Sequence, residues 1–265
     1  VEPGEPVVTS AGAYPTFNFH VTGFGGKLHT VPYVNDHEDP ESLIAKATKV
    51  SAKIIYFANP DNPMGSWHSA DVVNGLINNL PKSTLLVLDE AYVDLAPAGT
   101  APALLPETPN VIRMRTFSKA YGMAGARVGY AIGPKKLIAA FDKVRNHFGM
   151  SHISQVGALA ALLDQNYFER VLKNVQKSRQ QITDVARANG LKALPSATNF
   201  VAIDCGQDGD FARALLQRLL ADQIFVRMPN ISPLDRCIRV SCGDARAMEA
   251  FAHALPNALK AVQAT

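Results

Sequence analysis

The sequence predicts an α/β protein in which a large domain with a mostly parallel sheet is followed by a smaller α+β domain. Between residues 7 and 147, short apolar runs alternate with helical stretches, as in an α/β layer. Beyond this point the pattern changes to long helices and a few separated apolar runs. We therefore expect a large domain at residues 1–147 and a small C-terminal domain at residues 148–265, which includes the connecting helix.

Local signals place the elements of the large domain. A helix is expected to begin at Pro40 with Asp39 as its N-cap, because proline suits the first helical position and aspartate accepts from free amides. A second polar-capped helix follows near Ser69. The prolines of segment 59–65 oppose continuation of the strand before them. Apolar runs predict strands at residues 7–9, 26–33, 54–58, 84–88, 111–115 and 128–133.

The second half begins with helices. A helix is expected from residue 134, Gly149 marks a break, and residues 151–189 read as largely helical with Gly157 as an interruption. The helix around residues 167–187 has a one-sided apolar stripe, which indicates that one face is buried. The remaining pattern predicts a strand at 199–204, a helix at 210–221, strands at 224–227 and 237–241, and a helix at 246–262.

Composition excludes several classes of protein. The chain has 265 residues, 47% hydrophobic content and a formal charge of +3, and it has no basic run that would suit nucleic acid. No apolar segment approaches the roughly 20 residues that span a bilayer, and residues 1–6 do not resemble a signal peptide. The three cysteines, Cys205, Cys237 and Cys242, lack metal-like spacing. We expect reduced thiols in a cytoplasmic protein without a metal site.

The stretch from Thr116 to Arg127 lies between two predicted strands and combines hydroxyls, an amine and a guanidinium. Lys119 can form a Schiff base with an aldehyde, while Thr116, Ser118 and Arg127 can hold a phosphate. Together they suit pyridoxal 5′-phosphate (PLP), which needs an imine partner, a phosphate site and an anion beside its ring nitrogen. Taken alone, however, this stretch is better explained as a solvated loop, because Lys and Arg are usually exposed.

Two further polar residues favour a cofactor site over a solvated loop. Asn62 follows one predicted strand, Asp89 ends the next and Lys119 follows a third, each separated by about one βα unit. The carboxyl ends of strands in a parallel sheet are where ligands bind. An amide, a carboxylate and an amine in three consecutive units are unlikely to meet there by chance. The pattern therefore predicts a PLP site at this edge of the sheet.

Four motifs resemble one known family. They are Asn-Pro-Asp-Asn-Pro-Met-Gly at 59–65, Asp-Glu-Ala-Tyr at 89–92, Ser-Lys at 118–119 with Arg127, and Cys-Ile-Arg-Val at 237–240. They resemble fold-type I PLP-dependent aminotransferases of class I/II, and within that class the histidinol-phosphate aminotransferases. The resemblance covers essentially the whole chain. It implies a PLP-transferase-like fold, a homodimer, and a small-molecule amino donor and 2-oxo acid as substrates.

The resemblance also implies a role for each matching residue. Lys119 is implied to be the Schiff-base lysine and Asp89 the partner of the ring nitrogen, with Tyr92 as a third catalytic residue. Asn62 and Tyr92 would hydrogen-bond the ring hydroxyl, and Phe17 would stack on the ring. Thr116, Ser118 and Arg127 would hold the phosphate. Arg239 would bind the α-carboxylate of the substrate, and Arg227 would contact the distal group of the substrate.

Simpler explanations exist for four of these residues. Asp89 could cap a helix, Tyr92 and Phe17 could be packed core aromatics, and Arg227 could be solvated or structural. The chain also departs from the family pattern, because Met64 stands where the family usually has Thr. Family members usually have a preceding segment with a glycine-rich turn that binds the phosphate. We expect the large domain to be N-terminally incomplete in this respect.

The implied reaction transfers an amino group between an amino acid or amino-alcohol phosphate, such as histidinol phosphate, and 2-oxoglutarate, as in histidine biosynthesis. Two alternatives stay open. A PLP-dependent decarboxylase or lyase of the threonine-phosphate decarboxylase kind has nearly the same residues, and it would release CO2 and an amine. A catalytically silent, aminotransferase-like fragment is the other alternative.

Overall fold

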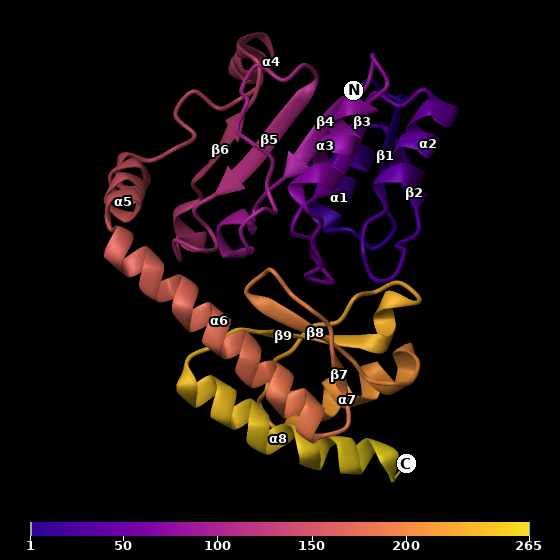
Figure 1. Cartoon of the computed structure of the whole chain (residues 1–265), viewed down its shortest axis with the longest axis vertical. Coiled ribbons are helices and arrows are strands. Elements are labelled where there is room, and N and C mark those ends of the chain that lie inside the picture. Colours follow the sequence, from indigo (N-terminus) through magenta and orange to yellow (C-terminus); the bar gives the residue numbers. More distant parts are fainter. Residues whose placement is uncertain (1, 265) are drawn as a thin grey trace.

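A computed structural model describes residues 2–264, and a six-stranded sheet forms its upper half (Figure 1). The strand order is β2-β1-β3-β4-β5-β6, with parallel pairing throughout except between β5 and β6, which are antiparallel. This confirms the predicted mostly parallel sheet. The strands are β1 (Pro6–Ser10), β2 (Lys27–Val31), β3 (Ile54–Ala58), β4 (Leu85–Asp89), β5 (Val111–Thr116) and β6 (Gly129–Ile132).

Two of the helices beside this sheet, α2 (Pro40–Val50) and α3 (Ala70–Asn78), begin where their capping residues predict. The Asp39 carboxylate accepts from the Ser42 amide at 3.3 Å, and the Ser69 hydroxyl accepts from the Val72 amide at 3.4 Å. Both caps satisfy amides that have no partner within the helix. The remaining helices here are α1 (Pro15–Gly23) and α4 (Lys135–Ala140).

The side chains of β3 point to two different surroundings. Those on one face lie in the apolar core, and Tyr56 on the other face lies near the predicted site. Ile55 and Phe57 are fully buried among the apolar residues of α2 and α3. Because side chains alternate along a strand, Tyr56 points to the opposite face, where Phe17 of α1 packs against it. One face therefore forms the core, and the other supports polar residues at the strand ends.

Two long helices lead from the upper half of the molecule to the lower half. They are α5 (His152–Leu163) and α6 (Gln165–Ala188), and Figure 1 shows α6 descending along one side. Gly157 lies inside α5 and does not interrupt it, so the expected interruption was wrong. A single glycine costs a helix only about 1 kcal/mol relative to alanine, which the rest of the helix can offset.

The lower half contains an antiparallel sheet with strand order β7-β8-β9. Its core packs against α6 and two C-terminal helices. The predicted strand at 224–227 was wrong. Only one bridge forms there, between Arg227 and Arg239, and Pro229 has no amide to extend it. The elements are β7 (Lys192–Ala193), which was not predicted, β8 (Phe200–Asp204), α7 (Gly209–Ala221), β9 (Cys237–Ser241) and α8 (Ala245–Gln263).

Two small apolar clusters join the halves. Met64, after β3, packs with Leu194, Ala202 and Leu234, while Tyr92, after β4, packs with Phe200 and residues of α6. The carboxyl edge of the large sheet therefore faces the small sheet. No helix within residues 2–264 is long and apolar enough to cross a membrane. The division into domains at residue 147 remains a prediction, and it falls between α4 and α5.

Candidate active site

The structure brings several predicted residues together at the carboxyl edge of the large sheet. Asn62 follows β3, Asp89 is the last residue of β4, and Lys119 follows β5. The Lys119 amine lies 5.0 Å from the centre of the Tyr92 ring, and its charge lowers the pKa of Asp89. Arg239 reaches the same edge from β9 and donates to Asn62 Oδ1. Residues from both halves of the molecule therefore meet at one site.

Asp89 is held by two hydrogen bonds and keeps capacity for another partner. The Tyr56 hydroxyl donates to Oδ2 at 2.5 Å, and the Ala91 amide donates to Oδ1 at 2.9 Å. Burial raises the pKa of Asp89, while both bonds and the Lys119 charge oppose that rise. No α-helix begins here, so Asp89 is not a helix cap. A carboxylate offers about four lone-pair directions, which leaves room for a bound cation.

Lys119 and the hydroxyls beside it lie at the end of β5. The Thr116 hydroxyl donates to Ser118 Oγ at 2.9 Å, and the Ser118 amide donates to Thr116 Oγ1 at 3.0 Å. Thr116 pairs with Gly129 of β6, so Arg127 approaches the same end of the strand pair. Arg127 is exposed and donates to the Ala124 carbonyl oxygen at 2.9 Å. Across residues 2–264, the Lys119 amine has no hydrogen-bond or ion-pair partner.

Arg239 presents a positive charge without a carboxylate partner among the described residues. Its guanidinium carbon lies 4.7 Å from the centre of the Phe200 ring, and its Nε atom is buried and unpaired. Burial lowers the pKa of Arg239, but an arginine keeps its charge in proteins. A half-buried guanidinium with an unused donor is suited to bind an anionic ligand.

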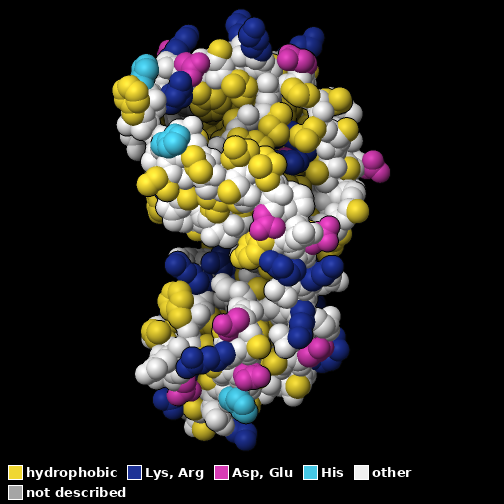
Figure 2. Space-filling model, turned by 90° about the vertical axis from the view of Figure 1, so that its left-hand side faces the viewer, with side chains coloured by type: hydrophobic (Ala, Val, Ile, Leu, Met, Phe, Trp, Pro, Cys, Tyr) yellow, Lys and Arg dark blue, Asp and Glu magenta, His cyan; other side chains and the backbone are white. Residues whose placement is uncertain are grey.

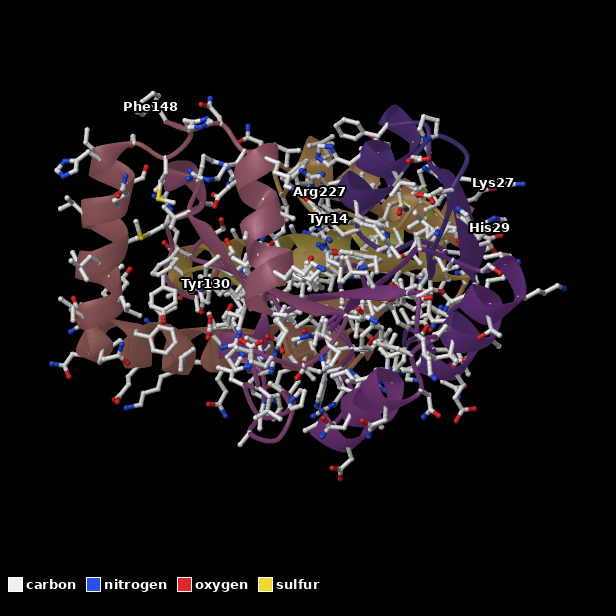
Figure 3. All side chains as sticks on the ribbon, turned by 90° about the horizontal axis from the view of Figure 1, so that it is seen from above. Tyr14, Lys27, His29, Tyr130, Phe148 and Arg227 are labelled. Atoms are coloured by element: carbon white, nitrogen blue, oxygen red, sulfur yellow. The ribbon has the colours of Figure 1, made fainter. Side chains whose placement is uncertain are left out.

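Arg227 lies beside Arg239 but is more exposed. The two backbones exchange hydrogen bonds of 3.1 and 2.6 Å, and the charge of Arg227 lowers the pKa of Arg239. The Arg227 guanidinium carbon lies 5.4 Å from the centre of the exposed Phe225 ring. Figure 3 labels Arg227 and Tyr14, both of which act electrostatically on Arg239.

Phe17 and Tyr92 are both packed against other aromatic rings. The rings of Phe17 and Tyr56 stack with centres 4.4 Å apart and planes inclined by 17°. Tyr92 is buried and meets Phe200 edge to face at 5.6 Å. Both residues therefore pack as aromatics, as the simpler explanation expects, and both also lie at the edge that carries Asp89 and Lys119.

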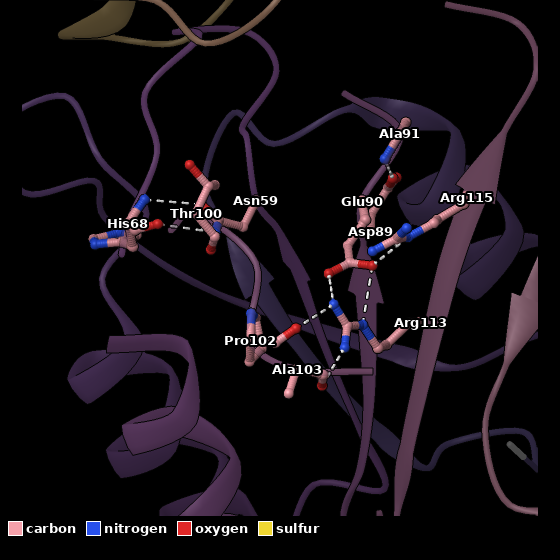
Figure 4. A network of polar contacts seen from close by, with 10 residues as sticks. All are labelled: Asn59, His68, Asp89, Glu90, Ala91, Thr100, Pro102, Ala103, Arg113 and Arg115. Atoms are coloured by element: carbon pink, nitrogen blue, oxygen red, sulfur yellow. Dashed lines mark hydrogen bonds and ion pairs between the residues drawn. The ribbon is translucent and has the colours of Figure 1, made fainter. Parts of the chain in front are cut away.

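A buried ionic network next to Asp89 was not anticipated from the sequence (Figure 4). The Glu90 carboxylate accepts from Arg113 at 2.5 and 3.0 Å and from Arg115 at 2.8 Å. Arg113 also donates to two backbone carbonyls of the segment at 102–103. Two arginines at alternate positions of an apolar strand were the available signal, because they share one face and need a buried anion.

A second unanticipated group consists of buried carboxyls behind the site. The Tyr33 hydroxyl donates to Asp61 at 2.7 Å, and Glu38 accepts from the Ser10 hydroxyl at 2.7 Å. Burial raises the pKa of Asp61 to about 7 and raises the pKa of Glu38 well above its ordinary range. Both carboxyls also add to the raised pKa of Tyr56, which burial and Asp89 raise most. The segment around Asn62 is therefore fixed by buried polar contacts.

The residues present suit pyridoxal 5′-phosphate. Lys119 supplies an unpaired amine, Asp89 supplies a carboxylate with free lone pairs, and Thr116 and Ser118 place two hydroxyls at the neighbouring strand end. Arg239 adds a buried, unpaired Nε–H donor at the rim. In the same order, these residues offer an imine partner, an anion for the pyridinium, donors for the phosphate and a donor for an anionic substrate.

Comparisons with known proteins agree with this chemistry. The family model for aminotransferase class I and II matches residues 1–255. A histidinol-phosphate aminotransferase from Geobacillus sp. (strain WCH70) is 30% identical over 99% of this chain and 72% of its own length. The crystal structure of histidinol-phosphate aminotransferase from Sinorhizobium meliloti in complex with pyridoxal-5′-phosphate is 53% identical, with a TM-score of 0.97 over 99% of this chain and 72% of that one.

A decarboxylase shares the fold. The L-threonine-O-3-phosphate decarboxylase from Porphyromonas gingivalis has a TM-score of 0.78 over 97% of this chain and 78% of that one, at 20% identity. Similarity at that level shows the architecture and does not distinguish between reactions.

Proposed function

The chain belongs to the class I and II aminotransferases, which are PLP-dependent transaminases, and from this premise we propose that it transfers an amino group between histidinol phosphate, or a similar amino donor, and 2-oxoglutarate. The observation that carries the proposal is the unpaired Lys119 amine, which lies beside Tyr92 and within electrostatic reach of Asp89. A solvated surface lysine would not lie among these groups at the ends of adjacent parallel strands.

Each residue has a distinct part in this proposal. When bound, PLP supplies an aldehyde carbon that accepts the amino group and a ring that draws electrons from it. Lys119 anchors that aldehyde carbon and moves the proton at the substrate Cα. Asp89 holds a proton on the ring nitrogen, because its negative charge favours the protonated ring. Asn62 and Tyr92 orient the ring oxygen.

The binding residues complete the site. Thr116, Ser118 and Arg127 would hold the phosphate, and Phe17 would pack against the ring. The Arg127 guanidinium binds the Ala124 carbonyl oxygen and is otherwise exposed, so it would turn toward the phosphate on binding. Phe17 already has one face against Tyr56, and its other face would serve the coenzyme. These contacts position the ring and do not act on protons.

Arg239 and Arg227 support substrates with anionic groups. Arg239 is half-buried without a carboxylate partner in the described chain, and Arg227 places a second positive charge beside it. A guanidinium binds a carboxylate or a phosphate through paired hydrogen bonds. Such a pair would serve both 2-oxoglutarate, which carries two carboxylates, and an amino-alcohol phosphate.

The proposed assembly is a homodimer in the cytoplasm. Exposed apolar side chains gather on the segment before α5 and on α5 itself, including Phe148, which is 94% exposed, and Ile153, which is 85% exposed. Figure 2 shows this side of the molecule, with hydrophobic side chains gathered over its upper half. A face of this kind is typical of a surface that is covered by a partner. The cysteines, none of which forms a disulfide, support a reducing compartment.

The proposal is tested by adding PLP to the purified protein and treating it with borohydride. We expect an absorbance band in the wild type and, after reduction, a covalent mass increase located at Lys119. Lys119→Ala should lose both, whereas Lys135→Ala, which removes an exposed lysine of α4, should keep both. Transfer of the amino group to 2-oxoglutarate would then be followed by product analysis.

Two outcomes would contradict the proposal. If Lys119→Ala retained the reduced adduct, the anchoring lysine would be wrong. Release of CO2 and an amine, without formation of glutamate, would identify the reaction as a decarboxylation instead. A wild-type protein that binds PLP but acts on no amino donor would point to a catalytically silent chain.

A further inference from the structure

Tyr56 contacts two of the proposed coenzyme residues, Asp89 and Phe17, without belonging to any of the motifs that carry the resemblance. Its hydroxyl donates to Asp89 Oδ2 at 2.5 Å, and its ring stacks on Phe17 at 4.4 Å. It is 5% exposed, so neither contact competes strongly with water. Two proposed partners of the coenzyme, one for the ring nitrogen and one for the ring face, are therefore attached to the same side chain.

The sheet register explains how Tyr56 reaches Asp89. Tyr56 of β3 pairs with Val87 of β4, and Ala58 pairs with Asp89. Tyr56 and Asp89 therefore lie on one face as diagonal neighbours, a separation that an aromatic side chain can span. The phenol hydroxyl therefore reaches the Asp89 carboxylate from the neighbouring strand. Phe17 stacks on the phenol ring and limits its rotation.

The surrounding charges give this hydrogen bond an electrostatic role. Burial raises the pKa of Asp89, and the Glu90 charge adds to that rise, whereas the Tyr56 hydroxyl, the Ala91 amide and the charge of Lys119 lower it. Burial raises the pKa of Tyr56, and Asp89 and then Glu38 and Asp61 add to that rise, so its hydroxyl stays protonated as a donor. Among the groups around Asp89, Tyr56 is the side-chain donor that favours the ionised carboxylate.

We propose that Tyr56 is a positioning residue. Its hydroxyl holds the Asp89 carboxylate in the ionised form and aims it at the ring nitrogen of the coenzyme. The part of this proposal that concerns the coenzyme rests on the proposed function. The part that concerns Asp89 itself does not, because the hydrogen bond belongs to the protein alone. A hydrogen bond to a charged group is roughly twice as strong as one between neutral groups.

The first test measures the pKa of Asp89 in the coenzyme-free protein by NMR, using protein labelled with ¹³C at the aspartate carboxyl. Tyr56→Phe keeps the ring and its stack on Phe17 but removes the hydroxyl. We expect the pKa of Asp89 to rise by about one unit or more. Replacing Tyr56 with 3-fluorotyrosine keeps the hydroxyl and makes it more acidic, so we expect a shift in the opposite direction.

Tyr33→Phe is the matched control. It removes another tyrosine hydroxyl that donates to a buried aspartate, Asp61, at 2.7 Å. We expect it to raise the pKa of Asp61 and to leave that of Asp89 nearly unchanged. An unchanged pKa of Asp89 in Tyr56→Phe, or an equal shift in both variants, would overturn the proposal. Should Tyr56→Phe fail to fold, the fluorotyrosine protein decides alone, and a pKa that does not fall would overturn it.

The second test measures the affinity for PLP by spectroscopic titration between pH 5 and pH 9. We expect Tyr56→Phe to weaken binding about tenfold near neutral pH. The loss of affinity on acidification should begin at a higher pH than in the wild type, because the raised pKa of Asp89 lets the carboxylate protonate earlier. A general packing defect would weaken binding equally at every pH.

A double-mutant cycle separates an action through Asp89 from a direct one. In an Asp89→Asn background, the added change Tyr56→Phe should alter PLP affinity by less than about threefold, because the charge that Tyr56 supports is already absent. A full tenfold loss in that background would overturn the proposal. If the wild type binds no PLP, the proposed function fails, while the NMR measurement still decides the role of Tyr56.

Discussion

At the residue scale, Arg227 and Arg239, whose backbones form a β-bridge, have the same charge but differ in burial. Arg239 lies under Phe200, contacts Asn62 and keeps a buried, unpaired Nε atom. Arg227 is exposed and rests on Phe225. A charge in a partly desolvated site interacts more strongly with a ligand than one in water. Arg239 should therefore contribute more to substrate binding than Arg227.

The corresponding prediction concerns steady-state kinetics. We expect Arg239→Gln to lower kcat/KM about 100-fold, mainly through KM, because losing a paired, charged contact costs about 3 kcal/mol. Arg227→Gln should lower it less than tenfold, because exposed charges contribute about 1 kcal/mol or less. Arg239→Lys keeps the charge without the paired geometry and should recover only part of the loss. Equal effects at both arginines would contradict this ranking.

At the element scale, the position of Asp89 depends on how the end of β4 is tied to β5. Glu90 is 2% exposed and bonds to both Arg113 and Arg115 of β5. Arg113 extends the connection to the carbonyl of Pro102 at 3.2 Å. This network fixes the residue next to Asp89 and the strand that leads to Lys119. The two strand ends are therefore held in register by side chains as well as by the backbone.

Glu90→Gln is expected to destabilise the fold by about 3 kcal/mol or more, because it leaves the buried Arg113 guanidinium without a counter-ion and removes the ion pair of the partly buried Arg115. The free energy of unfolding would be measured by denaturant titration. Asp142→Asn is the control, since it breaks the exposed Asp142–Arg145 pair, whose side chains are 67% and 57% exposed, and should cost less than about 1 kcal/mol. A loss below 1 kcal/mol for Glu90→Gln would show that the network is not required for stability.

At the scale of the whole molecule, the active site and the exposed apolar face belong to different surfaces. The site lies where the large sheet faces the small one, joined by the clusters around Met64 and Tyr92. The apolar face lies on the outer side of the molecule, along α5 and the segment before it. Its residues make few contacts within the described chain, so its burial would require another molecule.

We expect the wild type to sediment at twice the chain mass of 28.5 kDa. The double substitution Ile153→Asp and Leu159→Asp, at positions that are 85% and 58% exposed, should shift the protein to the monomer mass, because charge opposes burial of that face. Leu220→Asp, on α7, is a control at a 45% exposed leucine and should leave the mass unchanged. A wild type that sediments as a monomer would contradict the homodimer.

The sequence by itself determined the parallel sheet, the two helix caps and the order of Asn62, Asp89 and Lys119 at the strand ends, because local periodicity and chain order carry that information. Only the tertiary structure decided which side chains meet. Tyr56 reaches Asp89 across 33 positions and Arg239 reaches Asn62 across 177, and the strand expected at 224–227 became a single bridge. Such contacts depend on register, burial and the approach of distant segments, and local patterns do not specify them.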